Sequence, residues 1–124
     1  MPRAKILVVE DERPLNLLIK TKLEAHGYDV VQAYDGEAAL KLIMAEPPDL
    51  VVLDIMLPLL DGWEVLERMR GQAQTANLPV ICLTALSEQK DIARGWNAGT
   101  DCYLTKPVDL EALLKMVERF MDVS

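Results

Sequence analysis

Residues that bind transition metals or form disulfides are scarce in this sequence. Its 124 residues include two cysteines and one histidine. Cys82 and Cys102 do not have the spacing of zinc ligands, and only His26 could join them in a site. We therefore expect both cysteines to be small core residues, lying in predicted strands, of a protein kept in a reducing compartment.

Basic charge and long apolar runs are also lacking. Acidic residues outnumber Lys and Arg by 20 to 13, and the net charge of −7 argues against direct binding of nucleic acid, which needs a basic face. No apolar run approaches the roughly 20 residues of a membrane span. Acidic residues follow Ile6–Val9 at once, which is unlike a signal peptide. We expect a cytoplasmic protein without membrane contact.

Apolar content is sufficient for one folded domain, which we predict to span residues 1–124. Short apolar runs alternate along the chain with segments of helical periodicity. The predicted strands cover residues 4–9, 30–33, 50–54, 78–83 and 101–104. The predicted helices run from Pro14 to Gly27, onward from Asp35, around Val65 to Met69, through Ile92 and Trp96 to about Gly99, and from Leu110 to Met121. This alternation predicts an α/β fold, a doubly wound five-stranded parallel sheet of order 2-1-3-4-5 with five helices.

The run Leu50–Asp54 consists of four apolar residues followed by one carboxylate. Prolines bound it on both sides, which favours a short strand buried in a parallel sheet. Asp54 then stands where the strand ends. In open α/β sheets, ligands bind outside the carboxyl ends of the strands. Asp54 is therefore a candidate for chemistry.

Polar residues follow the other predicted strands at the same edge of the sheet. Glu10–Glu12 follow the first strand, Thr84 the fourth and Lys106 the fifth. In the order 2-1-3-4-5 the first and third strands are neighbours, so Asp11 and Asp54 should lie side by side. Lys106 would stand two strands from Asp54, roughly 10 Å by backbone, a distance that its side chain can largely cross.

Carboxylates gathered in this way need a cation. Two unit charges about 4 Å apart repel by about 4 kcal/mol at an effective dielectric constant near 20. A ligand set made only of hard oxygens favours Mg²⁺, or Mn²⁺, over Zn²⁺. With the Thr84 hydroxyl and the Lys106 ammonium, the group suits a phosphoryl substrate, and Asp54 could attack phosphorus to form an acyl phosphate. Each residue alone also has an ordinary explanation, as a helix start, a turn or an N-cap.

The ordered set of residues closely resembles the receiver domain of two-component response regulators, over essentially the whole chain. The residues that carry the resemblance are Glu10–Glu12, Asp54 with Met56, Pro58 and Asp61–Gly62, then Thr84–Ala85, and finally Tyr103–Pro107. The first acid, Glu10, stands where many relatives have Asp, and Leu59–Leu60 is bulkier than the small residues common in that loop.

The resemblance implies that Asp54 is the phosphoacceptor. It also implies that Asp11 and Asp54 bind Mg²⁺ directly, with the backbone carbonyl of Met56 as a third ligand and Glu10 acting through water. The implied phosphoryl donor is a sensor histidine kinase or a phosphotransfer protein.

The resemblance gives the remaining residues roles in holding the phosphoryl group and in signalling. Thr84 is implied to supply the hydroxyl that follows the phosphoryl group, and Lys106 the cation that pairs with it. Tyr103 is implied to be an aromatic switch whose rotamer changes with Thr84. The peptide before Pro107 is expected to be cis. A downstream protein would bind the fourth helix, fifth strand and fifth helix, so the chain would be a signalling protein and not an enzyme.

Other readings stay open at this point. A phosphohydrolase of the haloacid-dehalogenase type would want an acid where Met56 stands, and a degenerate receiver would be only an interaction scaffold. The sequence has no G-x-G-x-x-G motif after the first strand, which argues against dinucleotide binding. We expect Trp63 to lie either near the site or half-exposed in the first turn of a helix. Trp96 is expected to be buried. We expect no effector domain after the fifth helix, so the chain would bind another protein or pass its phosphoryl group on; the alternative is that it is part of a longer regulator.

Overall fold

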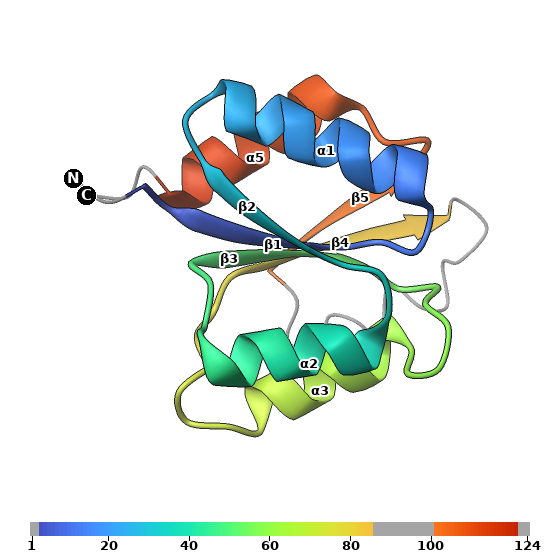
Figure 1. Cartoon of the computed structure of the whole chain (residues 1–124), viewed down its shortest axis with the longest axis vertical. Coiled ribbons are helices and arrows are strands. Elements are labelled where there is room, and N and C mark those ends of the chain that lie inside the picture. The colour runs from blue at the N-terminus through green and yellow to red at the C-terminus, as the bar shows by residue number, and fades with distance from the viewer. Residues whose placement is uncertain (1–2, 86–100, 122–124) are drawn as a thin grey trace.

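The fold is one sheet between two layers of helices, as Figure 1 shows. The computed structural model describes residues 3–85 and 101–121. The strands are β1 (Lys5–Val9), β2 (Asp29–Ala33), β3 (Leu50–Asp54), β4 (Val80–Ala85) and β5 (Cys102–Lys106). The described helices are α1 (Arg13–Ala25), α2 (Gly36–Ala45), α3 (Gly62–Arg70) and α5 (Leu110–Met121). None of these helices has the length and apolar character needed to cross a membrane.

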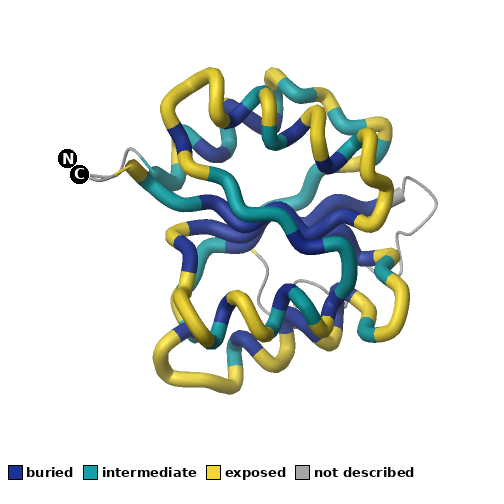
Figure 2. Tube along the Cα trace, in the orientation of Figure 1, coloured by how far each residue is buried: buried dark blue, intermediate teal, exposed yellow. Residues whose placement is uncertain are grey.

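All strand pairs are parallel, and their order is β2-β1-β3-β4-β5, which confirms the predicted topology. The sequence of each strand suits its position. Every residue of β3 is buried, as expected for a central strand covered on both faces. The edge strand β2 is only half-buried over most of its length and carries Asp29 and Gln32 (Figure 2).

The four described helices divide evenly between the two faces of the sheet. Helices α1 and α5 cover one face, and α2 and α3 cover the other (Figure 1). Because side chains alternate along a strand, β3 contributes to two cores. Val51 and Leu53 pack in the core beneath α2 and α3, whereas Leu50 and Val52 pack in the core beneath α1 and α5.

The ends of β4 and β5 differ from the prediction. β4 begins at Val80 instead of Leu78, because Leu78 N–H closes a turn on the Thr75 carbonyl and Pro79 has no N–H to give. β4 and β5 both extend farther than predicted, because Thr84 pairs with Thr105 and Ala85 pairs with Lys106. The helix predicted through Ile92 and Trp96 lies outside the described residues.

Two predicted cysteine positions can be compared with the structure. Cys82 is buried in β4, as expected. Cys102 is half-buried in β5, where its Sγ lies 3.2 Å from Met116 Sδ of α5. Neither cysteine forms a disulfide with the described residues.

Gly62 allows α3 to begin directly against the end of β3. A Cβ atom at this position would lie 2.6 Å from the Asp54 carbonyl oxygen and 2.6 Å from Ile55 Cα, both of them backbone atoms. The Gly62 N–H donates to the Ile55 carbonyl at 2.9 Å, and the Asp61 side chain caps the helix by accepting from Glu64 N–H at 3.0 Å. The start of α3 is thereby fixed beside Asp54.

Replacing Gly62 with alanine should therefore destabilise the protein by about 2–3 kcal/mol, because rigid backbone must move to admit the methyl group. Urea denaturation measures the loss. Gly71→Ala is the matched control, since the nearest atoms to its added Cβ are 3.6 Å away and its backbone is right-handed helical. Equal stabilities for the two variants would contradict the close approach seen at Gly62.

Candidate functional site

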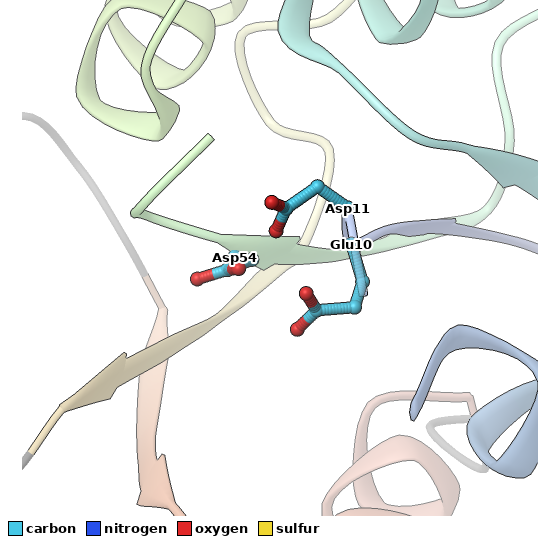
Figure 3. A group of neighbouring side chains, drawn as sticks. All are labelled: Glu10, Asp11 and Asp54. Atoms are coloured by element: carbon cyan, nitrogen blue, oxygen red, sulfur yellow. The ribbon is translucent and has the colours of Figure 1, made fainter. Parts of the chain in front are cut away.

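Three carboxylates meet at the carboxyl ends of β1 and β3 (Figure 3). Val9 pairs with Leu53, so the residues that follow these two meet at the end of the sheet. One oxygen from each of Glu10, Asp11 and Asp54 lies within 4.8 Å of the others. Glu10 and Asp54 are almost fully buried, whereas Asp11 is exposed. The predicted meeting of Asp11 and Asp54 is confirmed.

Lys106 reaches this cluster from β5. Its ammonium nitrogen lies 2.9 Å from Glu10 Oε1, 3.1 Å from Asp54 Oδ2 and 3.6 Å from Glu12 Oε1. The side chain thus crosses the two strand spacings that the sequence predicted. The Lys106–Pro107 peptide is cis, as expected.

Asp54 is held at both of its carboxylate oxygens. Oδ1 accepts the N–H of Met56 at 3.1 Å, and Oδ2 accepts from the Lys106 ammonium. Burial raises the pKa of the Asp54 carboxyl, and the positive charge and hydrogen bond of Lys106 oppose that rise. For Lys106, burial lowers the pKa of the ammonium, but its ion pairs with Glu10 and Asp54 outweigh burial and raise the pKa overall.

Glu10 is the least satisfied member of the cluster. Its Oε2 accepts the N–H of Glu12 at 3.0 Å. Its buried Oε1 lies near the Lys106 ammonium but makes no directed hydrogen bond with the described residues. Burial is the main reason why the pKa of Glu10 rises from 4.5 to about 7, and the nearby charge of Asp54 adds to the rise.

The cluster has an excess of negative charge that a further cation could neutralise. Among the described contacts the single ammonium of Lys106 pairs with Glu10, Glu12 and Asp54. Asp11 adds a further negative charge to the same cluster. One buried carboxylate oxygen is also left without a directed donor. A small divalent ion with a preference for oxygen would relieve both conditions.

The remaining candidate residues lie around this cluster. Thr84 is buried at the end of β4, one residue beyond Leu83, which pairs with Asp54. Tyr103 is half-buried on β5, and its ring meets that of Trp63 edge-to-face, with the centroids 6.3 Å apart and the planes at 68°. Trp63 is buried, so the half-exposed interpretation of this residue is wrong.

An open cleft of about 500 Å³ leads to the acidic cluster, and Trp63 is part of its wall. Asp11, Pro58 and Asp61 also line the cleft. Met56 lines it too and is 62% exposed. The predicted position of Trp63 near the site is therefore confirmed.

A family model described as the response regulator receiver domain matches residues 6–118. The chain belongs to this family. Among curated proteins, the receiver domain is 43% identical over 121 residues to RpaA of Synechocystis sp., a DNA-binding dual master transcriptional regulator. The match covers 98% of this chain and 49% of RpaA, so the chain spans about half the length of such relatives.

Solved structures agree with this assignment. A putative response regulator from Chloroflexus aurantiacus superposes with a TM-score of 0.92 at 30% identity, covering 98% of this chain and 99% of that one. The receiver domain of the sensor histidine kinase PA1611 from Pseudomonas aeruginosa superposes with a TM-score of 0.89 at 30% identity, covering 98% and 99%. That structure has a magnesium ion coordinated in its active site cleft.

Asn16 is a residue near this site that the sequence interpretation missed. It is fully buried on α1, and its side-chain amide donates to the carbonyl of Glu10 at 3.0 Å and to that of Ala33 at 3.2 Å. Its own oxygen accepts from Gln32 at 2.9 Å. Asn16 therefore joins α1 to the ends of two strands and fixes the backbone that carries Glu10. Its position three residues before the buried Ile19, on the apolar face of the helix, was the available signal.

The loop between β3 and α3, residues 55–61, is tightly folded. Leu60 N–H donates to the Pro58 carbonyl at 2.8 Å, which closes a three-residue turn around Leu59. Leu59 has a φ of 68°, a left-handed conformation that costs a non-glycine residue about 1–2 kcal/mol. The loop also packs on α2, because a Cβ at Gly36 would lie 2.1 Å from the Leu60 carbonyl oxygen.

The raised pKa of Glu10 predicts how stability varies with pH when no divalent ion is present. Between about pH 4.5 and 7 the folded receiver retains a proton that the unfolded chain has lost, so this group stabilises the fold less as pH rises through that window. Between pH 4.5 and pH 7.5, the free energy of unfolding should therefore fall by about 2 kcal/mol more in the native protein than in the Glu10→Gln variant.

Urea denaturation in chelator at pH 4.5 and pH 7.5 measures this difference. Glu37→Gln, an exposed change on α2, is the control and should follow the native protein. A Glu10→Gln curve parallel to that of the native protein would contradict the buried, poorly satisfied state of Glu10.

Proposed function

We propose that this receiver domain is a phosphorylation switch of a two-component system, with Asp54 as the phosphoacceptor. The observation that carries the proposal is a buried carboxylate, held by Lys106 and next to Asp11, which lines an open cleft. The donor is a phosphohistidine on a sensor histidine kinase or a phosphotransfer protein.

The acidic cluster supports a role for Mg²⁺, with Mn²⁺ as a substitute. Asp11 and Asp54 would bind the ion directly, the Met56 carbonyl would be a third ligand, and Glu10 would act through water. The magnesium ion in the cleft of the PA1611 receiver domain supports the same assignment. When bound, the ion neutralises charge on the carboxylates and on the phosphoryl oxygens.

Transfer needs only one nucleophile from this chain. A carboxylate oxygen of Asp54 attacks phosphorus, a P–O bond forms, and the P–N bond to the donor imidazole breaks with its electron pair left on nitrogen. Because Asp54 is almost fully buried, few waters can compete there for the phosphoryl group. Lys106 and Thr84 lie at the ends of neighbouring strands near Asp54, which supports a role for both in holding phosphoryl oxygens.

Phosphorylation then changes what the surrounding residues contact. The Lys106 ammonium gains phosphoryl oxygens as partners in place of the bare carboxylate, and Thr84 follows the phosphoryl group. Tyr103, which already packs on Trp63, reports the change and shifts an existing equilibrium between two states. The output surface for a downstream protein is β5, α5 and the predicted fourth helix.

The family match and the intact set of Asp11, Asp54, Thr84 and Lys106 favour this function over a degenerate scaffold. A hydrolase of the haloacid-dehalogenase type is disfavoured, since Met56 supplies only backbone groups where that chemistry wants an acid. The chain acts as a signalling protein that catalyses its own phosphorylation. We place it in the cytoplasm, in keeping with its membership of the receiver family and with two cysteines that form no disulfide with the described residues.

Acetyl phosphate with Mg²⁺ should add one phosphate to the native chain, detected by intact mass spectrometry. The label should disappear in Asp54→Asn and in the presence of chelator. Asp61→Asn is the matched control, since this acid lines the same cleft and its amide can still cap α3. An unlabelled native protein would favour the scaffold, and continuous release of phosphate from an external phosphoester would favour the hydrolase.

A further inference from the structure

Asn16 places a side-chain amide in the interior of the domain, between α1 and the ends of β1 and β2. The side chain is fully buried. The other buried residues of α1, Ile19 and Leu23, are apolar and pack in the core beneath this helix. An amide costs free energy to bury unless its polar atoms are paired, so packing alone favours an apolar residue here. Asn16 therefore needs an explanation other than packing.

The hydrogen bonds of Asn16 fix the orientation of its amide. The nitrogen donates to the carbonyls of Glu10 at 3.0 Å and Ala33 at 3.2 Å, and the oxygen accepts from Gln32 at 2.9 Å. Carbonyl oxygens can only accept, so the N–H groups of the amide must face them. The Ala33 carbonyl also accepts the Glu10 N–H at 3.1 Å. Asn16 thus holds the junction where β1 and β2 end.

This junction determines the direction in which two acidic side chains leave the backbone. Val9 is the last residue of β1 that pairs with the neighbouring strands, so Glu10 and Asp11 lie beyond the paired strand. The carbonyl of Glu10 and the N–H of Asp11 belong to one planar peptide group. By holding that carbonyl, Asn16 fixes the plane of the peptide that joins the two acids.

The acidic cluster benefits from such a restraint before an ion arrives. One oxygen from each of Glu10, Asp11 and Asp54 lies within 4.8 Å of the others, and like charges at this distance repel. Asp11 is exposed, so its carboxylate could turn into solvent and lessen the repulsion. A fixed backbone limits this movement. The carboxylates then stay close to the arrangement that binds an ion, and such preorganisation raises affinity.

We infer that Asn16 is a positioning residue for the divalent ion, because it holds the Glu10–Asp11 peptide so that both carboxylates meet Asp54. The inference rests on the proposed function, since it concerns the ion that serves the phosphoacceptor. Asn16 acts through the backbone and not as a ligand. Gln32 supports it by holding the amide oxygen. Residues that orient metal ligands in this way typically change metal affinity by about 10- to 100-fold.

The test measures binding of Mn²⁺ by electron paramagnetic resonance, in which the free aqueous ion gives the signal. Asn16→Leu keeps the approximate size of the side chain and removes its hydrogen bonds. The dissociation constant for Mn²⁺ should rise about tenfold in this variant. Gln32→Leu leaves Asn16 in place without the bond to its amide oxygen, and should raise the constant about threefold.

Ile19→Ala is the matched control for damage to α1. Ile19 is fully buried on the same face of the helix, and its truncation destabilises the packing without removing a hydrogen bond of the site. The dissociation constant for Mn²⁺ should stay within about twofold of native, since affinity depends on the ligands and the groups that hold them. Circular dichroism checks that each variant is folded.

Labelling by acetyl phosphate gives an independent measure of the same effect. In Asn16→Leu, the Mg²⁺ concentration for the half-maximal labelling rate should rise about tenfold, while the rate at saturating Mg²⁺ should stay within about twofold of native. This split is expected because the carboxylates themselves are unchanged and meet again once the ion is bound.

Several outcomes would overturn the inference. A native dissociation constant in Asn16→Leu would remove any role in ion binding, and an equal rise in Ile19→Ala would make Asn16 a structural residue of α1. If Asn16→Leu does not fold, Gln32→Leu decides: a raised constant supports the inference and an unchanged one contradicts it.

The design also separates this inference from the proposed function. Failure of the native chain to bind Mn²⁺ would overturn the proposed metal site and, with it, the role of Asn16. Native binding of Mn²⁺ without labelling by acetyl phosphate would instead overturn the proposed phosphoacceptor, and the Mn²⁺ constants of the variants would still decide the role of Asn16.

Discussion

The position of one ammonium group among buried carboxylates controls the rest of this site. Lys106 lies within 3.1 Å of oxygens on both Glu10 and Asp54, two acids with almost no exposure to water. A single buried carboxylate is costly, and two so close together repel, so the ion pairs are needed for both to stay charged. Burial still raises the pKa of Glu10 to about 7, so the contact with Lys106 only partly offsets the cost of burying this acid. The site is therefore organised around a shortage of positive charge, in keeping with the proposed binding of a divalent ion and a phosphoryl group.

Much of the fold was predictable because its strands are short, apolar and separated by periodic helices. The strand order followed from the common topology of such sheets, and with it came the meeting of Asp11 with Asp54 and the reach of Lys106. The ends of β4 and β5 were not predictable from composition, because the ladder between Thr84 and Thr105 depends on pairing between strands.

Other parts of the site depend on contacts that a linear pattern does not contain. Asn16 is polar on an apolar face, and its role appears only when the carbonyls of Glu10 and Ala33 are seen to converge on it. The bulk of Leu59 was visible in the sequence, but its positive φ arises from a loop fixed by Gly36 and Gly62. The burial of Trp63 against Tyr103 likewise depends on where α3 meets β5.

The alternation of side chains along β3 has a consequence for how a signal could spread. Leu53 and Val52 immediately precede Asp54, yet they point to opposite helical layers. A small displacement of the end of this strand would press on both layers at once, so neither needs a chain of relays to sense it. The alternating side chains of this one central strand would therefore couple the two helical layers to each other.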